Sequence, residues 1–125
     1  MPKFATCLNC MDGRVQLPAI NWLMKEYSAE YVDMITEAGM DGYLVKNEKL
    51  PEGFIYKLNI SAEKHGSKHI FIVGHYDCGG HPVDEKTHRE HVHISVDKIK
   101  SIMPDSKVIG LWINEKWAVE KIVEK

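Results

Sequence analysis

Short, continuously apolar segments alternate along the chain with segments whose apolar residues recur at helical spacing. The short segments predict strands at residues 3–10, 30–38, 68–75 and 107–114. The helical spacing predicts helices at residues 18–27, 54–65 and 92–103, with Pro104 ending the last of them. Strands that alternate with helices predict an α/β fold, with a mostly parallel central sheet of about four or five strands flanked by helices.

Three further segments lack a clear apolar period. Residues 40–53 and 76–91 contain Gly, Pro and many charged residues and are predicted to be polar connections. Residues 115–125 fit an edge strand and a helix equally well, because their apolar residues satisfy both spacings. The length of 125 residues predicts one domain that spans residues 1–125.

Composition and charge exclude several functional classes. The net charge is −2 and no basic run occurs, so neither nucleic acid nor a membrane surface is an expected partner. The apolar runs are too short to span a bilayer, and the first residues do not resemble a secretory leader. The cysteines number three, which is atypical of a secreted disulfide framework. We therefore expect reduced thiols in the cytoplasm, where cysteines more often bind metals or take part in catalysis.

Cys7 and Cys10 form a C-x-x-C pair near the start of the chain. On a strand, residues three apart point to opposite faces, and their Cα atoms lie about 10 Å apart. A disulfide needs a Cα separation below about 7 Å. We therefore expect Cys7 to be a small buried residue and Cys10 to belong to another group of residues. A redox dithiol is the alternative.

Residues with metal-binding side chains follow two of the predicted strands. Cys10 ends the first strand, while His75 and Cys78 come at and just after the end of the third. In parallel sheets ligands gather beyond the carboxyl ends of the strands, so these three residues are expected to meet there. Two thiolates and one imidazole suit Zn²⁺ and leave a fourth position open, as in catalytic zinc sites. A loop histidine beside a core cysteine is the alternative.

Asp12 and Arg14 directly follow the first of these residues. A carboxylate two residues from a thiolate ligand can occupy the fourth zinc position, or it can accept a hydrogen bond from zinc-bound water. Arg14 can hold the carboxylate of Asp12 through a bidentate pair and keep it ionised. A surface Asp-Gly-Arg turn without function is the alternative.

The segments CMDGR at 10–14 and GHYDCGG at 74–80 together resemble the β-class carbonic anhydrases, whose signatures are C-x-D-x-R and H-x-x-C. The resemblance implies zinc bound by Cys10, His75 and Cys78. It also implies that Asp12 and Arg14 form the catalytic pair, with Asp12 as a fourth zinc ligand in a closed state. The implied reaction is the reversible hydration of carbon dioxide to bicarbonate by zinc-bound hydroxide, in a homodimer or higher homo-oligomer. Hydrolysis of carbonyl sulfide or carbon disulfide, and a non-catalytic zinc-binding role, are the alternatives.

The chain also departs from that family. Members usually carry additional N-terminal helices, and their second strand commonly ends in Arg-Asn-Ala-Gly where this chain has Thr-Glu-Ala-Gly at 36–39. Gly13 stands where Ser is common. Four histidines, His81, His88, His91 and His93, lie in or beside the predicted connection at 76–91 and are expected to be solvated. A proton relay through them is one alternative. A second metal site there is another, for which the sequence offers no support.

Overall fold

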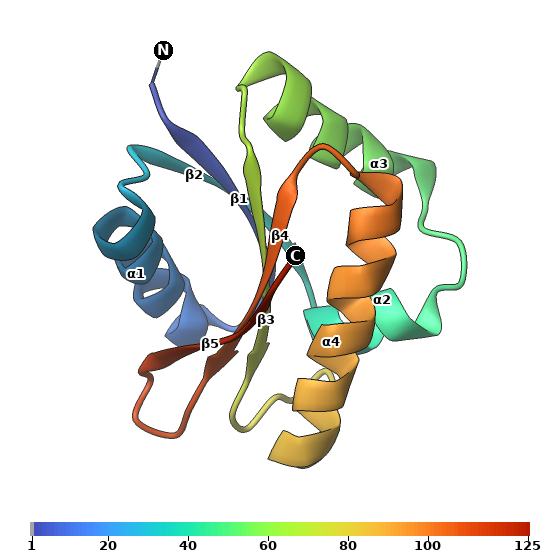
Figure 1. The fold of residues 1–125 in the computed structure, drawn as a ribbon. Coiled ribbons are helices and arrows are strands. Elements are labelled where there is room, and N and C mark those ends of the chain that lie inside the picture. Colours follow the sequence, from blue (N-terminus) through green and yellow to red (C-terminus); the bar gives the residue numbers. More distant parts are fainter. Residues whose placement is uncertain (1) are drawn as a thin grey trace.

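One five-stranded sheet runs through the centre of the structure, a computed structural model that describes residues 2–125 (Figure 1). Its strands lie in the order β2-β1-β3-β4-β5. Their bounds are Phe4–Cys10 (β1), Tyr31–Glu37 (β2), His69–His75 (β3), Lys107–Ile113 (β4) and Val119–Glu124 (β5). The first four strands are parallel, and β5 runs antiparallel to β4. The predicted α/β class with a mostly parallel sheet is therefore confirmed.

Four α-helices within the described residues cover the two faces of this sheet. They are α1 (Gln16–Tyr27), α2 (Met40–Lys46), α3 (Glu52–Asn59) and α4 (Glu85–Ile102). Helix α1 follows a short 3₁₀ turn and lies on one face, while α2, α3 and α4 lie on the opposite face (Figure 1). Helix α3 continues as one turn of π-helix, Ile60–Lys64. The molecule therefore has three layers, with the sheet in the middle.

Apolar side chains fill both layers between the sheet and the helices. On the α1 side Leu23 packs in one cluster with Phe71, and on the other side Leu8 packs in a second cluster with Val96. Strands β3 and β4 contribute residues to both clusters, because successive side chains of a strand point to opposite faces. Burial on both faces explains why these two strands were predictable as continuous apolar runs.

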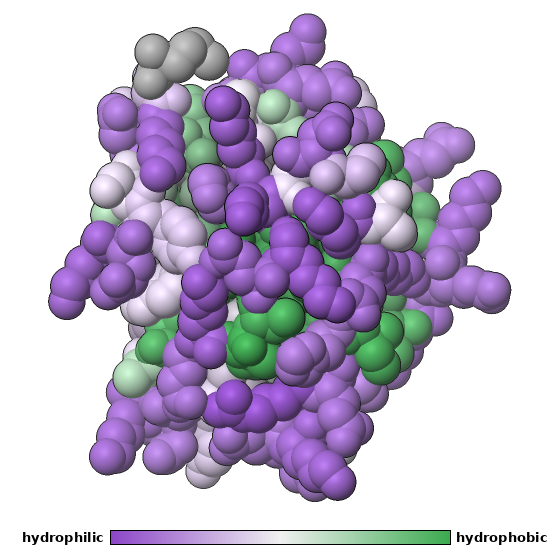
Figure 2. Space-filling view, in the orientation of Figure 1, coloured by the Kyte–Doolittle hydropathy of each residue, from purple (hydrophilic) through white to green (hydrophobic). Residues whose placement is uncertain are grey.

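The outer surface is mostly hydrophilic on the face shown in Figure 2, with apolar side chains in small groups. Two apolar residues near the carboxyl end of β1 are nonetheless largely exposed: Met11 at 65% and Leu17 at 66%. None of the helices described between residues 2 and 125 is both long and apolar enough to cross a membrane. The exposed apolar groups therefore lie on the surface of a three-layered fold.

The prediction that residues 40–53 form a polar connection was wrong, because they include helix α2. Met40 and Leu44 lie one turn apart on this helix and are fully buried. Asp41 and Gly42, which weaken the helical signal in the sequence, are also buried. They face neighbouring elements rather than solvent, so tertiary packing outweighs their low helix propensity.

The second predicted connection, 76–91, was wrong in its last seven residues, 85–91. Helix α4 begins at Glu85, seven residues before the predicted start at 92. Its N-cap is Asp84, whose Oδ1 accepts a hydrogen bond from the backbone N–H of Thr87 at 2.9 Å. The early turns escaped prediction because charged residues and histidines dominate them. One of these histidines, His88, occupies a buried position on the helix.

The end of the chain forms the edge strand β5, which settles the ambiguity between strand and helix. A tight turn joins β4 to β5, with the backbone N–H of Asn114 donating to the carbonyl of Ala118 at 3.0 Å. Within that turn Trp117 adopts a left-handed backbone conformation with φ of 59°. Residues 119–124 are therefore a strand, because the hairpin turn reverses the chain and pairs them with β4.

The packing of α1 against the sheet can be tested with two leucines on the same helix. Leu23 is fully buried against the sheet, whereas Leu17 is mostly exposed. We expect Leu23→Ala to lower the free energy of unfolding by about 2–5 kcal/mol, since it deletes buried volume. The control Leu17→Ala should change it by less than about 0.5 kcal/mol. Equal losses in denaturant unfolding would contradict this assignment of the buried face of α1.

Candidate metal centre

Three metal-binding side chains converge at the carboxyl ends of two adjacent strands. Cys10 is the last residue of β1, His75 is the last residue of β3, and Cys78 lies in the turn that follows. Their potential ligand atoms all lie within 4.8 Å of one another, and all three residues are buried. The turn is made possible by Asp77, whose φ of 56° lies in the left-handed region. The predicted meeting of these residues is thus present in the structure.

The hydrogen bond made by His75 determines which of its nitrogens can bind a metal. Nδ1 lies 2.8 Å from the backbone carbonyl oxygen of Tyr76. A carbonyl only accepts hydrogen bonds, so Nδ1 carries the proton and Nε2 keeps its lone pair. Nε2 is buried and has no hydrogen-bond partner. A neutral imidazole held through Nδ1–H, with a free Nε2, is the usual form of a metal-binding histidine.

The two sulfur atoms share a strongly polarised environment. The neighbouring Cys78 thiol, together with His75 and the backbone N–H of Gly39, lowers the pKa of Cys10 to about 4, against the opposing effect of burial. The Gly39 N–H lies 3.3 Å from the Cys10 Sγ. The same contact with Cys10, reinforced by burial, raises the pKa of Cys78. The site therefore holds one thiolate readily, and a bound cation would favour the second.

The charge of the Cys10 thiolate also acts on the imidazole. Burial by itself lowers the pKa of His75, but the neighbouring Cys10 sulfur, the Tyr76 carbonyl and the charge of Asp12 outweigh it, so the pKa is raised. The centre is thus negatively polarised and attracts positive charge. Such a set of two sulfurs and one nitrogen matches the donor preference of Zn²⁺.

Cys7 takes no part in this centre. It is fully buried and packs in the cluster on the α1 side of the sheet. Burial raises its pKa to about 12, which is the behaviour of an inert core thiol. All three cysteines are free, so no disulfide joins Cys7 to Cys10 within the described residues. The prediction of Cys7 as a small buried residue is confirmed.

Asp12 and Arg14 form the bidentate pair that the sequence suggested. Arg14 donates from Nη2 to Oδ2 of Asp12 at 2.7 Å and from Nε to Oδ1 at 3.1 Å. The backbone N–H of Arg14 also donates to Oδ1 at 2.9 Å. These hydrogen bonds lower the pKa of Asp12 to about 2, although partial burial opposes the shift. Asp12 is therefore an oriented carboxylate, 20% exposed, beside the three metal-binding residues.

Two further residues that the sequence did not indicate hold Arg14 in place. Asp77 accepts hydrogen bonds from the guanidinium through its Oδ2 at 3.2 Å and its carbonyl at 3.0 Å. The ring of Trp117 lies under the guanidinium, with its centroid 4.8 Å from Cζ. Asp77 lies inside the H-x-x-C segment and could have been noticed there. Trp117 could not, because only the hairpin between β4 and β5 brings it near.

Close backbone contact between two loops fixes the position of the Cys78 turn. A Cβ atom on Gly80 would lie 2.6 Å from the backbone carbon of Ala38 and 2.7 Å from the nitrogen of Gly39. Gly39 itself has a φ of 62° and donates to Cys10. The loop after β2 therefore contacts both cysteine-bearing segments. Only a residue without a side chain at 80 permits this approach.

The expectation that the additional histidines are solvated was wrong for two of the four. His81 and His88 are buried, at 5% and 1% exposure. His91 is half-buried, and only His93 is exposed as expected. The error follows from the missed start of α4, since a helix directs His88 inward where a loop would leave it in solvent. These residues do not contribute to the group formed by Cys10, His75 and Cys78.

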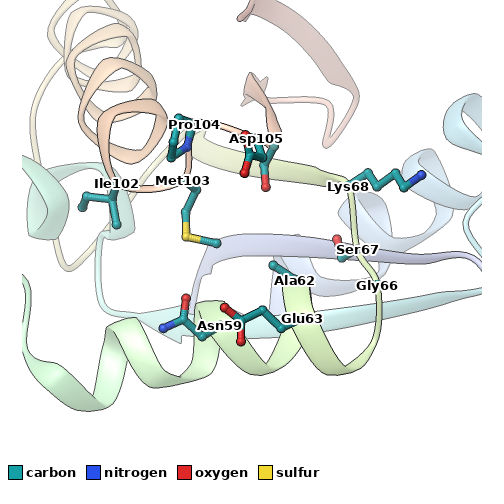
Figure 3. Close-up of a pocket in the computed structure, with 11 residues that line it drawn as sticks. Asn59, Ala62, Glu63, Gly66, Ser67, Lys68, Ile102, Met103, Pro104 and Asp105 are labelled. Atoms are coloured by element: carbon teal, nitrogen blue, oxygen red, sulfur yellow. The ribbon is translucent and has the colours of Figure 1, made fainter.

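A cavity of about 640 Å³ lies elsewhere in the fold, near the amino ends of β3 and β4 (Figure 3). Side chains from the end of α4 and from the segment after α3 line it, among them Met103, Asp105 and Glu63. In Figure 3 the labelled groups lie around an open space that contains no histidine or cysteine. The group formed by Cys10, His75 and Cys78 therefore lies away from this cavity.

Comparison with known proteins places this geometry in context. A family model described as "Putative carbonic anhydrase" matches residues 1–123. No curated protein is similar enough in sequence to match. A carbonic anhydrase from Streptococcus mutans has a similar structure, with a TM-score of 0.68 and 19% identity over 98% of this chain and 83% of that one.

Two eukaryotic structures are similar to the same degree. The β-carbonic anhydrase isoform I of Trichomonas vaginalis gives a TM-score of 0.67 at 17% identity, covering 98% of this chain and 84% of that one. A structure from a study of two tetrameric β-carbonic anhydrases of Sordaria macrospora gives 0.66 at 12% identity, covering 99% and 82%. At such identities the likeness establishes a shared fold.

The contact between Gly80 and the loop after β2 can be tested with two neighbouring glycines. Gly80→Ala should lower the free energy of unfolding by about 1–3 kcal/mol, because the new methyl group meets backbone atoms that cannot move aside. Gly79→Ala is the matched control, since a Cβ there would have no atom within 4 Å. Thermal unfolding of both variants measures the difference. If Gly80→Ala is as stable as Gly79→Ala, the close approach does not exist.

Proposed function

The chain belongs to the family described as Putative carbonic anhydrase, and we propose that it is a zinc-dependent enzyme that converts carbon dioxide reversibly to bicarbonate. The observation that supports this most strongly is the convergence of Cys10, His75 and Cys78 within 4.8 Å, next to a carboxylate held by an arginine. The similar solved structures from Streptococcus mutans and Trichomonas vaginalis are described as carbonic anhydrases.

The three side chains fit zinc by their chemistry. Cys10 and Cys78 offer sulfur, and His75 offers a buried nitrogen whose lone pair has no partner within the chain. When bound there, zinc would lower the pKa of water toward about 7 and so supply a nucleophile at neutral pH. Three protein ligands leave a position free for that water, as in other catalytic zinc sites.

Asp12 is proposed to orient the nucleophile. Hydration adds one water to one carbon dioxide and yields bicarbonate and one proton. The ionised carboxylate of Asp12 would accept a hydrogen bond from the attacking O–H group, which directs an oxygen lone pair toward the carbon. Arg14 binds both carboxylate oxygens and therefore favours this role for Asp12 over that of a fourth metal ligand. The released proton would pass to solvent, which reaches the partly exposed Asp12.

We propose that the enzyme works as a homodimer or larger homo-oligomer in the cytoplasm. Met11 and Leu17 flank the site residues and expose most of their apolar surface, which a second copy of the chain could cover. The structural neighbours from Sordaria macrospora are described as tetrameric. Three free cysteines agree with a reducing compartment.

The ligand set can be tested with single cysteine substitutions. Cys10→Ser and Cys78→Ser should each abolish metal binding at this centre, because zinc loses a thiolate from a site with only three protein ligands. Cys7→Ser is the matched control and should leave binding intact. The thiolate-to-metal absorption of cobalt-loaded protein reports on this centre specifically. Retention of that absorption in the Cys10 variant would refute the assignment.

The role of Asp12 can be tested with a substitution that keeps its shape. Asp12→Asn should retain the metal but lower the turnover of carbon dioxide by about 10–100-fold, since the neutral amide cannot replace the carboxylate. Asp77→Asn alters only the outer contact of Arg14 and should cost less. Stopped-flow hydration assays measure both. Full turnover in Asp12→Asn would contradict the proposed role, and activity on carbonyl sulfide alone would transfer the assignment to that substrate.

A further inference from the structure

We infer that Asp41, His81 and His88 form a second metal site, distinct from the cysteine centre, for a divalent transition metal such as zinc. The potential ligand atoms of these residues all lie within 4.8 Å of one another. They come from three separate segments: Asp41 from α2, His81 from the loop before α4, and His88 from α4. The inference rests on these residues alone and does not depend on the reaction proposed above.

The three side chains are withdrawn from solvent to a degree that is unusual for such groups. Asp41 and His88 are each 1% exposed, and His81 is 5% exposed. The Oδ2 atom of Asp41 lies 2.6 Å from Nδ1 of His88, its only side-chain hydrogen-bond partner within residues 2–125. Nε2 of His88 is buried and has no partner. Buried polar groups normally have partners, so this pair leaves binding capacity that the chain itself does not use.

Glycines make the room that His81 occupies. A Cβ on Gly42 would lie 2.5 Å from Nδ1 of His81, so this nitrogen lies beside the backbone next to Asp41. A Cβ on Gly39 would likewise lie 2.6 Å from the His81 Cβ. The ring packs edge-on against that of His88, with centroids 5.1 Å apart. The imidazole of His81 thus occupies a space beside Gly42, and the side chain of any larger residue at 42 would fill that space.

A third histidine, His91, contacts the outer side of this group. Nε2 of His81 lies 2.7 Å from Nδ1 of the half-buried His91, so one of these nitrogens donates to the other. If His81 donates through Nε2, its Nδ1 keeps a lone pair that is available to a metal. Outer hydrogen bonds of this kind fix the tautomer and the orientation of metal-binding histidines. His91 would therefore position His81, while Asp41 and His88 complete the ligand set.

The donor chemistry separates the two centres. One carboxylate oxygen and two imidazole nitrogens form a set typical of zinc and of other divalent transition metals, and it contains no sulfur. The centres also meet through one loop, since only Gly79 and Gly80 separate Cys78 from His81 along the chain. A metal at the second site would tie α2 and α4 to the loop that carries Cys78. It would thereby restrict the movement of that loop and stabilise the position of Cys78 in the first centre.

Cobalt titration of the metal-free full-length chain distinguishes the two sites. Thiolate ligands produce an intense charge-transfer absorption with cobalt, whereas nitrogen and oxygen ligands produce only weak d–d bands. We expect the wild-type chain to bind about two equivalents of Co²⁺, of which only one contributes to the thiolate absorption. If all the cobalt that binds produces the thiolate absorption, the inference is overturned. This test uses the wild-type chain alone.

Three variants localise the second equivalent. His88→Gln and His81→Gln should each lose the cobalt that lacks thiolate absorption and keep the cobalt that has it. His93→Gln is the matched control on α4, because His93 is exposed, and it should bind both equivalents. Should His88→Gln not fold, as judged by circular dichroism, His81→Gln and the wild-type titration decide the matter. A second equivalent that persists in His81→Gln, or that disappears in His93→Gln, would also overturn the inference.

Failure of the two proposals would look different in this experiment. If the thiolate absorption is missing while the second equivalent binds, the cysteine centre is refuted and the histidine site stands. If the thiolate absorption is present alone, the histidine site is refuted and the proposed zinc enzyme stands.

Discussion

The approach of Gly80 to the backbone of Ala38 and Gly39 is the contact on which the rest of the site depends. It joins the loop after β3 to the loop after β2 with no side chain between them. On one side of this contact the Gly39 N–H reaches the sulfur of Cys10, and Cys78 comes close to the same sulfur. On the other side the chain continues directly into His81. One backbone contact therefore lies between two groups of candidate metal ligands.

The free-energy cost of burying charged side chains explains why both groups of residues need specific polar partners around them. Buried thiolates and carboxylates are costly unless a partner compensates them. At the cysteine centre the compensation comes from backbone N–H groups and from His75, and bound zinc would complete it. Asp12 lies at the edge of the cysteine centre. The positive charge of Arg14 compensates its negative charge there, and the carboxylate stays partly exposed to solvent. The pair of Asp77 and Trp117 holds that arginine from its far side.

The parallel strands and most residues of the cysteine centre could be predicted from the sequence, because local patterns encode them. Buried parallel strands produce continuous apolar runs, and strand ends that carry Cys10 and His75 must lie at the same edge of the sheet. The Asp12–Arg14 pair is local, so spacing alone brings its members together. These features depend on periodicity and on contacts between near neighbours in the sequence.

The remaining features depend on tertiary contacts that no local pattern encodes. Helix α2 contains Asp41 and Gly42, whose propensities disfavour a helix, and packing against α4 and the sheet stabilises it there. The inward position of His88 follows from the N-cap at Asp84, which a run of charged residues obscured. Trp117 reaches Arg14 through the hairpin that ends the sheet. In each case long-range packing overrides the local signal.

We propose that the cysteine centre is a zinc site with carbonic anhydrase activity. Metal analysis combined with stopped-flow hydration of carbon dioxide by the purified full-length chain tests it most directly. We expect catalysed hydration that disappears when zinc is removed by a chelator and returns when zinc is restored. A chain fully loaded with zinc at its thiolate centre that hydrates carbon dioxide no faster than buffer would contradict it.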